Sequence, residues 1–357
     1  MIDVRELKLE KDRRVIITSD IHANLPLFQE LLEKVNYTKE DYLFINGDLC
    51  EKGPDSLSTV AFARKLSVES DRVFITKGNC DVVHDYVFNH VEGIKNYMEQ
   101  RKHSILNEML DLHGKSLDEF ATLQELGEFY RSHFGEVLAW LDQLPIAYET
   151  DDFIIIHAGI EDIPVWKETS RKYALYAQAF YEKGHQADKT VIAGHWPVVN
   201  YRANAVSSNC PLIDLEKRVI AIDGGNQIKE DGQLNAILIE GEDISYTYVD
   251  GLNEKTIIRD HVDERGRVGT VTYPNYELRL LKEEEFFTLC ENTNLGIEQW
   301  IKNEFIHEGR CKNDLSTTFL SVEKGETVSI VDDRHDGYAL VKSSSGEVGW
   351  IPKDCLL

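Results

Sequence analysis

The sequence has no long apolar run, few cysteines and comparatively few basic residues. No stretch reaches the roughly 18–20 apolar residues that a membrane-spanning helix needs, so a membrane protein is not expected. The six cysteines are scattered and form no CxxC pair, which argues against a disulfide framework and favours a reducing compartment. The N-terminal segment MIDVRELKLEKDRR is charged and lacks the apolar stretch of a signal peptide. We therefore expect a cytoplasmic protein.

The charge balance is strongly acidic. The chain has 39 Lys and Arg against 63 Asp and Glu, which gives a formal net charge of −24. Because such a surface repels phosphate backbones and anionic lipids, neither extended nucleic acid nor a membrane is an expected partner. Hydrophobic residues make up 42% and charged residues 29% of the 357 residues, as in ordinary globular proteins, and this length is typical of two or three domains.

Short apolar runs rich in Val, Ile and Phe predict buried strands in the first two-thirds of the chain. They lie at residues 14–18, 42–45, 72–76, 153–156 and 190–193, and further runs follow at 219–222, 236–239 and 246–249. Asn24 and Pro26 predict the start of a helix between the first two runs. Apolar residues in steps of three and four predict a long helix over 117–141. We expect an α/β domain over residues 1–250.

The chain changes character after this domain. Residues 251–305 mix charged and apolar positions, and we interpret them as a connecting extension with some helix. Residues 306–357 contain three short apolar runs separated by glycines, which predicts a small β-barrel.

Each of the first five predicted strands is followed by a residue of a type that binds metals. Because ligands lie outside the carboxyl ends of strands in open α/β sheets, these side chains are expected to meet. The candidate ligands are Asp20, His22, Asp48, Asn79, His157 and His195. Oxygen and nitrogen ligands without cysteine suit Mn, Fe or Zn, and six of them are enough for two adjacent divalent ions.

The segments around these residues carry a resemblance to a known family. They read SDIH (19–22), NGDLCEKGPDS (46–56), KGNCD (77–81), LPIAYETDDFIIIHAGI (144–160), IAGHWP (192–197) and AIDGG (221–225). The sequence resembles the calcineurin-like metallophosphoesterases over about residues 13–240. It is most similar to their phosphoprotein phosphatase branch, which includes serine/threonine protein phosphatases and bacterial diadenosine tetraphosphatases.

The resemblance implies a fold and a mechanism. The fold is an α/β (α+β) arrangement of two packed mixed β-sheets flanked by helices, with a dinuclear metal site at the strand ends. One metal would be held by Asp20 and His22, the other by Asn79, His157 and His195, with Asp48 bridging both. In the family a metal-bound hydroxide attacks phosphorus in line, because coordination lowers the pKa of water from about 15.7 to about 7.

Several catalytic positions depart from the family pattern. Lys52 stands where an arginine usually clamps the substrate phosphate, and it keeps the charge without the bidentate fork. Cys80 replaces the family's histidine beside the leaving group, whose acidic partner would be Glu51. Asp81 completes the candidate catalytic set, and we expect it to support the metal loop by hydrogen bonding. Arg202 is the candidate for a second cation that contacts phosphate.

The missing histidine has a predicted consequence. General acid catalysis contributes about 10²–10⁴-fold, so its loss is expected to penalise alkyl phosphates more than anhydrides or aryl phosphates. His84 lies four residues further along and could substitute as the acid, although we expect it at the surface.

Residues 320–357 resemble the SH3 fold through the segments LSVEKGE and GEVGWIP. The aromatic residues of the family's peptide groove are depleted. Tyr338 stands near the place of a tryptophan, Cys355 replaces a late tyrosine, and Trp350 and Pro352 remain. Its partner would be a Pro-rich peptide or another part of this chain, and we favour the second.

Three functions remain open from the sequence. The first is a dinuclear-metal-dependent phosphoesterase, similar to serine/threonine protein phosphatases, that hydrolyses phosphate esters. The second is a nucleotide phosphoanhydride hydrolase of the diadenosine tetraphosphatase type. The third is a degenerate phosphatase that serves as a phosphate-ligand sensor or scaffold, against which the presence of all six candidate ligands argues. The substrate would accordingly be a phosphoprotein, a small phosphate ester or a nucleotide.

Overall fold

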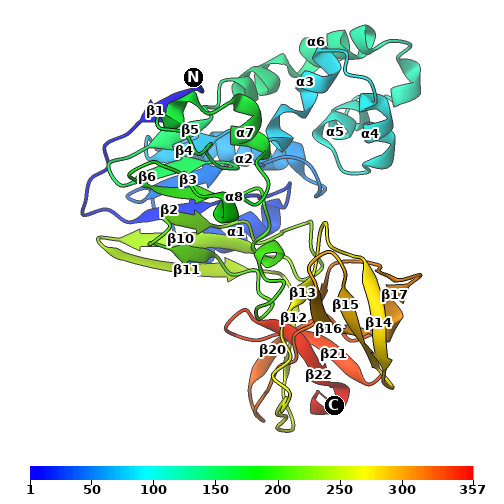
Figure 1. Cartoon of the computed structure of the whole chain (residues 1–357). Coiled ribbons are helices and arrows are strands. Elements are labelled where there is room, and N and C mark those ends of the chain that lie inside the picture. The colour runs from blue at the N-terminus through cyan, green and yellow to red at the C-terminus, as the bar shows by residue number, and fades with distance from the viewer. Residues whose placement is uncertain (357) are drawn as a thin grey trace. The chain divides into compact units, whose positions relative to one another are not determined.

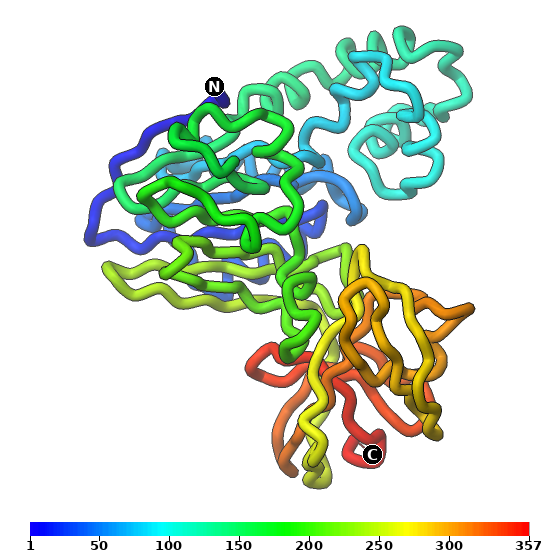
Figure 2. The backbone as a smooth tube through the Cα atoms, in the orientation of Figure 1, coloured from blue at the N-terminus to red at the C-terminus, as the bar shows by residue number. Residues whose placement is uncertain are grey.

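The computed structural model describes residues 1–356, which fall into two compact units. The first unit comprises residues 1–196, 211–228 and 234–249, and the second unit holds the rest of the described chain. The backbone therefore passes between the units more than once (Figure 2). Among the described residues, no helix is both long and apolar enough to cross a membrane.

Two mixed sheets form the centre of the first unit (Figure 1). The six-stranded sheet has the order β1 (Val4–Glu6), β5 (Ala147–Glu149), β6 (Phe153–Ile156), β7 (Thr190–Ala193), β9 (Val219–Ala221), β8 (Leu212–Asp214). The five-stranded sheet has the order β11 (Asp243–Val249), β10 (Leu234–Glu240), β2 (Val15–Thr18), β3 (Tyr42–Asn46), β4 (Val73–Thr76). All eight strands predicted in this region are present, and the sequence analysis missed β1, β5 and β8.

Apolar side chains from both sheets fill the space between them. Ile17 and Phe44 of the five-stranded sheet share one buried cluster with Ile155 and Ile192 of the six-stranded sheet. Helices α1 (Leu25–Lys34) and α2 (Ser56–Glu69) pack on the outer face of the five-stranded sheet, and α6 (Leu123–Asp142) packs against α3 (Val83–Phe88). Helices α7 (Arg171–Tyr176) and α8 (Phe180–Lys183) pack on the other sheet. The predicted sandwich of two mixed sheets flanked by helices is confirmed.

Helix α1 begins where the sequence predicts it. The side chain of Asn24 accepts a hydrogen bond from the Leu27 amide, and Pro26 lies in the first turn of α1. The helix predicted over 117–141 begins only at Leu123, because residues 117–119 form a separate 3₁₀ turn and Thr122 and Glu125 form a capping box at the start of α6. Between β4 and α6 the chain forms three short helices that the sequence analysis did not predict. They are α3 (Val83–Phe88), α4 (Ile94–Gln100) and α5 (Ile105–Asp111).

The second unit consists mainly of short strands. One sheet has four strands in the order β12 (Asn253–Thr256), β20 (Thr327–Asp332), β21 (Tyr338–Lys342), β22 (Val348–Pro352). Another has three strands in the order β14 (Leu278–Glu283), β15 (Phe287–Asn292), β16 (Ile297–Lys302). Shorter pairs are β13 (Thr270–Val271) with β19 (Leu315–Ser316) and β17 (Ile306–His307) with β18 (Arg310–Cys311). The expectation of helix within residues 251–305 is wrong for α-helix, because residues 278–302 pair as the antiparallel strands β14 to β16.

The aromatic residues of the predicted barrel lie in its core. Trp350 is fully buried, and its indole N–H donates to the carbonyl oxygen of Ser316 at 2.8 Å. Tyr338 packs edge-on against Phe287 and Phe319. Strand β12 of the predicted extension pairs with β20 of the predicted barrel, so hydrogen bonds join the two segments within one unit.

Candidate metal centre

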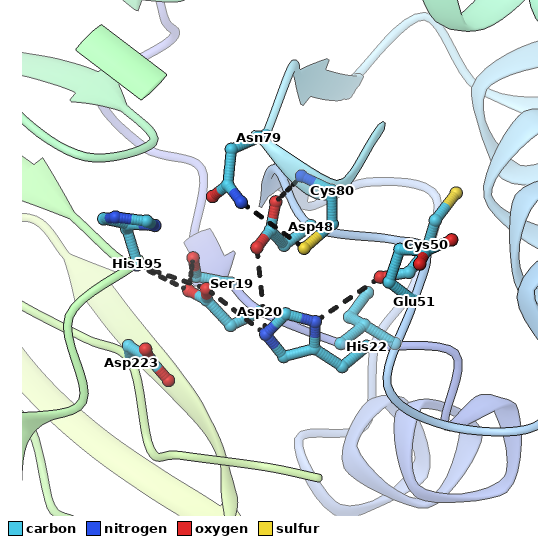
Figure 3. Close-up of polar contacts among 12 residues, drawn as sticks. Ser19, Asp20, His22, Asp48, Cys50, Glu51, Asn79, Cys80, His195 and Asp223 are labelled. Carbon is cyan, nitrogen blue, oxygen red and sulfur yellow. Dashed lines mark hydrogen bonds and ion pairs between the residues drawn. The ribbon is translucent and has the colours of Figure 1, made fainter. Parts of the chain in front are cut away.

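The strand ends of the first unit bring the predicted ligands together in sharp turns (Figure 3). Asp20, His22, Asp48 and His195 all have left-handed backbone conformations, with φ of 56°, 48°, 52° and 65°. L-residues rarely adopt this conformation, and such strain concentrates at functional sites. The turns also need glycine, because a Cβ at Gly78 would collide with the carboxylate of Asp48.

Two groups of ligand atoms share Asp48. One consists of His22, Asp48 and Cys80 and the other of Asp48, His157 and His195, and within each group the ligand atoms lie within 4.8 Å of one another. Oδ2 of Asp48 is 3.8 Å from Nε2 of His22, whereas Oδ1 is 3.4 Å from Nε2 of His157. The two oxygens of Asp48 thus face different imidazoles, which is the arrangement of a carboxylate that bridges two ions.

Asp20 and Asn79 lie at the same cluster. Oδ1 of Asp20 is 3.8 Å from Nε2 of His22, and the Asp20 carboxylate accepts hydrogen bonds from the His195 amide and the Ser19 hydroxyl. The amide oxygen of Asn79 is 3.0 Å from Nε2 of His157. The structure therefore brings all six predicted ligands into one region, and their role as ligands stays a prediction.

The imidazoles are oriented as metal binding requires. Nδ1 of His22 faces the Cys50 carbonyl oxygen at 3.4 Å, which leaves Nε2 buried in the cluster without a hydrogen-bond partner. Burial lowers the pKa of His22 to about 3, so the ring is neutral and the Nε2 lone pair is available. A backbone carbonyl on Nδ1 is a common support for a metal-binding histidine. Burial also lowers the pKa of His195 to about 3.

His157 gives a second reason to expect a cation. Its Nδ1 lies 3.1 Å from the Asn46 carbonyl oxygen, and its Nε2 lies 3.0 Å from the Asn79 amide oxygen. A neutral imidazole has one N–H and cannot donate to both oxygens. A metal ion at Nε2 and Asn79 resolves this conflict, so these residues fit a bound divalent ion.

The buried carboxylates of the cluster are a further reason to expect a bound cation. Burial, together with the nearby Asp81, raises the pKa of Asp48 to about 8. Burial and the neighbouring Asp223 raise the pKa of Asp20 well above its usual range. Cations of high charge density offset this penalty, because they stabilise the ionised carboxylates.

Removing the metal should therefore destabilise the protein more at alkaline than at neutral pH. The raised pKa values of Asp20 and Asp48 stabilise the metal-free fold in full below the unfolded pKa of 3.8. This stability is lost progressively as the pH rises, and for Asp48 the loss continues until about pH 8. The lowered pKa values of His22 and His195 have the opposite effect. Their contribution to stability is present above the unfolded pKa of 6.5 and is lost only as the pH falls below it.

Differential scanning fluorimetry with and without chelator checks this expectation. From about pH 7 to about pH 9 the melting temperature of the metal-free protein should fall on the order of 5 °C further than that of the loaded protein, since 1 kcal/mol corresponds to about 2–4 °C at this size. Parallel changes in both forms would contradict it.

Asp81 holds the loops that carry these ligands. Its Oδ1 accepts hydrogen bonds from the amides of Leu49 and Cys50, at 2.8 and 3.2 Å. Its Oδ2 accepts from the amides of Asp48 and Gly78, at 2.9 and 2.8 Å. One buried carboxylate thus joins the loop after β3 to the loop after β4, and this geometry makes Asp81 a positioning residue.

The Glu51 carboxylate makes its hydrogen bonds away from the expected position of a leaving group. Its carboxylate accepts hydrogen bonds from the Tyr97 hydroxyl at 2.5 Å and from the Ser104 hydroxyl and Ile105 amide, both at 2.9 Å. Burial raises the pKa of Glu51. The carboxylate therefore anchors α4 and the start of α5. Cys80 is also buried, and burial raises the pKa of its thiol.

The remaining sequence candidates have different positions. Lys52 is half-buried, and its positive charge adds to burial in lowering the pKa of His22, as expected for a cation beside the cluster. His84 is fully buried and its Nε2 lies 2.9 Å from Asp142, so the expectation of a surface histidine is wrong. Arg202 belongs to the second unit, at the end of a short 3₁₀ helix (Val198–Tyr201), and its contact with phosphate stays a prediction.

The sequence analysis missed a pocket of about 350 Å³ beside the metal centre. Lys52, Asn79 and Cys80 line its inner end, and Tyr86, Tyr97 and Tyr176 form much of its wall. The hydroxyl groups of Tyr86 and Tyr176 lie 3.0 Å apart, which links α3 to α7. No local motif marks these tyrosines, because they come from three separate helices.

Comparison with known proteins agrees with this geometry. The sequence profile of the calcineurin-like phosphoesterases matches residues 13–239, and that of the variant SH3 domain matches residues 301–357. The symmetrical bis(5'-nucleosyl)-tetraphosphatase of Vibrio campbellii (strain ATCC BAA-1116) is 30% identical over 165 residues, which is 46% of this chain and 50% of that protein.

Two further similarities cover different shares of the chain. The enzyme of the same name from Buchnera aphidicola subsp. Acyrthosiphon pisum (strain Tuc7) is 48% identical over 65 residues, 18% of this chain and 23% of that protein. A solved serine/threonine phosphatase from Saccharomyces cerevisiae aligns with a TM-score of 0.44 at 11% identity, over 71% of this chain and 85% of its own.

The matches cover half or less of these curated relatives, whereas the first family profile covers most of the present chain. That profile spans all six candidate ligands and most strands of both sheets, with β1 and β11 outside it. The chain belongs to the calcineurin-like phosphoesterase family.

Proposed function

We propose that this protein is a metal-dependent phosphohydrolase that cleaves a phosphoanhydride bond in a dinucleoside polyphosphate. The observation that carries the proposal is the tyrosine-walled pocket that ends at Lys52, Asn79 and Cys80. Aromatic side chains bind nucleobases by stacking, and a phosphoserine side chain offers nothing to stack. The matched part of the curated relatives, which are symmetrical bis(5'-nucleosyl)-tetraphosphatases, supports the same substrate class.

We propose the six clustered residues as the metal ligands. His22 and Asp20 would serve one divalent ion, His157, His195 and Asn79 the other, and Asp48 would serve both. Such ions activate water and stabilise the charge that develops on phosphate oxygens. Mn, Fe and Zn all suit these donors.

The chain's own groups bind and orient the phosphate. Lys52 lines the pocket, and its ammonium group would attract a phosphate as a point charge. Asp81 keeps Asp48 in place through the backbone amides on both sides of the site. The tyrosines at the pocket wall would place a nucleobase so that the phosphate chain reaches the metal centre.

The pocket also explains why an anhydride suits this site better than an alkyl ester. The Glu51 carboxylate accepts a hydrogen bond from Tyr97, and position 80 is a cysteine instead of an imidazole. None of the described residues that line the pocket is a histidine that could protonate a leaving group there. A nucleotide phosphate leaves without protonation far more readily than an alkoxide, so an anhydride loses less from the absence of a general acid.

Substrate comparison tests the proposal. Diadenosine tetraphosphate should be cleaved with a higher kcat/KM than a phosphoserine peptide. The variant Tyr176→Ala should lower kcat/KM for the dinucleotide by about 5- to 150-fold, since stacking on an aromatic residue is worth about 1–3 kcal/mol. The same variant should leave hydrolysis of inorganic tripolyphosphate, which has no base, nearly unchanged.

Tyr173→Ala is the matched control, because Tyr173 lies on the same helix α7 and outside the pocket wall. A wild-type preference for the phosphopeptide would overturn the proposed substrate class. Equal losses on the dinucleotide and on tripolyphosphate in Tyr176→Ala would overturn the role of the pocket.

For the second unit we propose a structural role. Trp350, which a peptide-binding groove would display, is fully buried, and Cys355 is buried as well. The aromatic contacts of Tyr338 with Phe287 and Phe319 belong to the core of the unit. These contacts support stability more than recognition of a Pro-rich peptide.

A further inference from the structure

Cys80 lies where a metal ligand would lie. Its ligand atom is within 4.8 Å of those of His22 and Asp48, and the three residues are buried. We infer that Cys80 binds the divalent ion proposed for Asp20, His22 and Asp48, so that a thiolate joins one imidazole and two carboxylates. The inference rests on the candidate metal centre alone and not on the proposed substrate.

The backbone fixes the thiol beside the bridging carboxylate. The Cys80 amide donates to Oδ1 of Asp48 at 2.8 Å, and Cys80 opens a short 3₁₀ helix (Cys80–Val82) that directs its side chain inward. Figure 3 shows the sulfur on the side that faces Asp48 and His22. The Asn79 amide donates to the sulfur at 3.5 Å, a weak contact that leaves it free to bind a cation.

His22 supplies independent evidence for an ion at this place. Its ring is fully buried, Nδ1 is occupied by the Cys50 carbonyl oxygen, and Nε2 has no hydrogen-bond partner. A buried nitrogen without a partner costs about 1–3 kcal/mol, and a metal ion removes this cost. The sulfur of Cys80 and the carboxylates of Asp48 and Asp20 lie around this nitrogen.

The chemistry is balanced by the release of one proton. When the ion binds, the Cys80 thiol gives its proton to solvent and the sulfur forms a bond to the metal. Thiolate ligands select thiophilic ions, so zinc should be held here better than manganese, which prefers oxygen ligands. A thiolate bound in this way cannot protonate a leaving group, which agrees with the absence of a general acid at this position.

X-ray absorption at the zinc edge tests the inference on the full wild-type chain. We expect one sulfur scatterer per two zinc ions at about 2.3 Å, the usual Zn–S distance. Only nitrogen and oxygen scatterers in the wild-type protein would overturn the inference. Because this measurement needs no variant and no turnover, it is independent of folding defects and of the substrate.

Cobalt titration provides the residue assignment. Cobalt(II) added to the metal-free chain should produce a sulfur-to-metal charge-transfer band that is lost in Cys80→Ser and kept in Cys50→Ser. Cys50 is the matched control, since it is buried in the neighbouring loop and belongs to neither ligand group. Zinc affinity should fall at least about 10- to 100-fold in Cys80→Ser. This is the loss that follows when a residue supporting a metal ligand is removed, and the removal of a ligand itself should cost no less. A band that survives in Cys80→Ser would overturn the assignment.

Discussion

Asp48→Asn is expected to lower manganese-dependent hydrolysis of para-nitrophenyl phosphate by about 10³-fold or more. The two oxygens of Asp48 face the two histidines of different ligand groups, at 3.8 and 3.4 Å. Asparagine keeps one oxygen and replaces the other by an NH₂ group, which cannot bind a cation. In other enzymes the loss of one hydrogen-bond donor that stabilises the transition state lowers kcat by about 10²–10³-fold, and here the residue would serve both ions.

The measurement pairs activity with metal content. Metal analysis of purified Asp48→Asn should show that at least one of two ions is lost, while circular dichroism remains that of the wild type. Asp71→Asn, at an exposed position before β4, is the control and should keep both activity and metal. Full activity in Asp48→Asn would show that this carboxylate does not bridge metals, and the candidate centre would have to be abandoned.

The ligand positions were predictable because strand ends are local features. Apolar runs such as VIIT of β2 and YLFIN of β3 are distinctive, and the parallel strands of one sheet necessarily end at a common edge. Asp20 follows β2 and Asp48 follows β3, so their proximity could be predicted without any information on tertiary packing. The glycine at 47 precedes one of these ligands and is itself part of the signal.

The environment of Glu51 was not predictable in the same way. Its partners Tyr97, Ser104 and Ile105 lie 46 to 54 residues away, on helices that no strong pattern announced. His84 was misplaced for a related reason. Helix α6 brings Asp142 against it from 58 residues away and buries it, which a reading of the local sequence could not show.

The strands of residues 251–305 were missed because their polar faces masked the alternation. In β14, LRLLKE, only Leu278 is buried, and the following residues are exposed. In β15, FTLCEN, the partly polar side chains Thr288 and Asn292 are buried beside apolar ones. A period of two is hard to recognise when polar residues occupy inward positions and charged residues fill the outer face.

Asp81→Asn is expected to destabilise the protein by about 3 kcal/mol and to weaken metal binding by about 10- to 100-fold. Each oxygen of Asp81 accepts hydrogen bonds from two backbone amides. Whichever way the asparagine amide points, its NH₂ group faces two N–H donors and leaves them buried without an acceptor. The loops that carry Asp48 and Asn79 then lose their common anchor.

Thermal unfolding of the metal-free protein and zinc titration measure the two effects separately. The melting temperature should fall by about 6–12 °C, given about 2–4 °C per kcal/mol at this size. Asp85→Asn is the matched control, because Asp85 lies four residues further along in an exposed ion pair with Arg171, and such pairs contribute only about 0–1 kcal/mol. If Asp81→Asn kept its stability but lost activity, Asp81 would act on the reacting atoms directly and not through the loops that it holds.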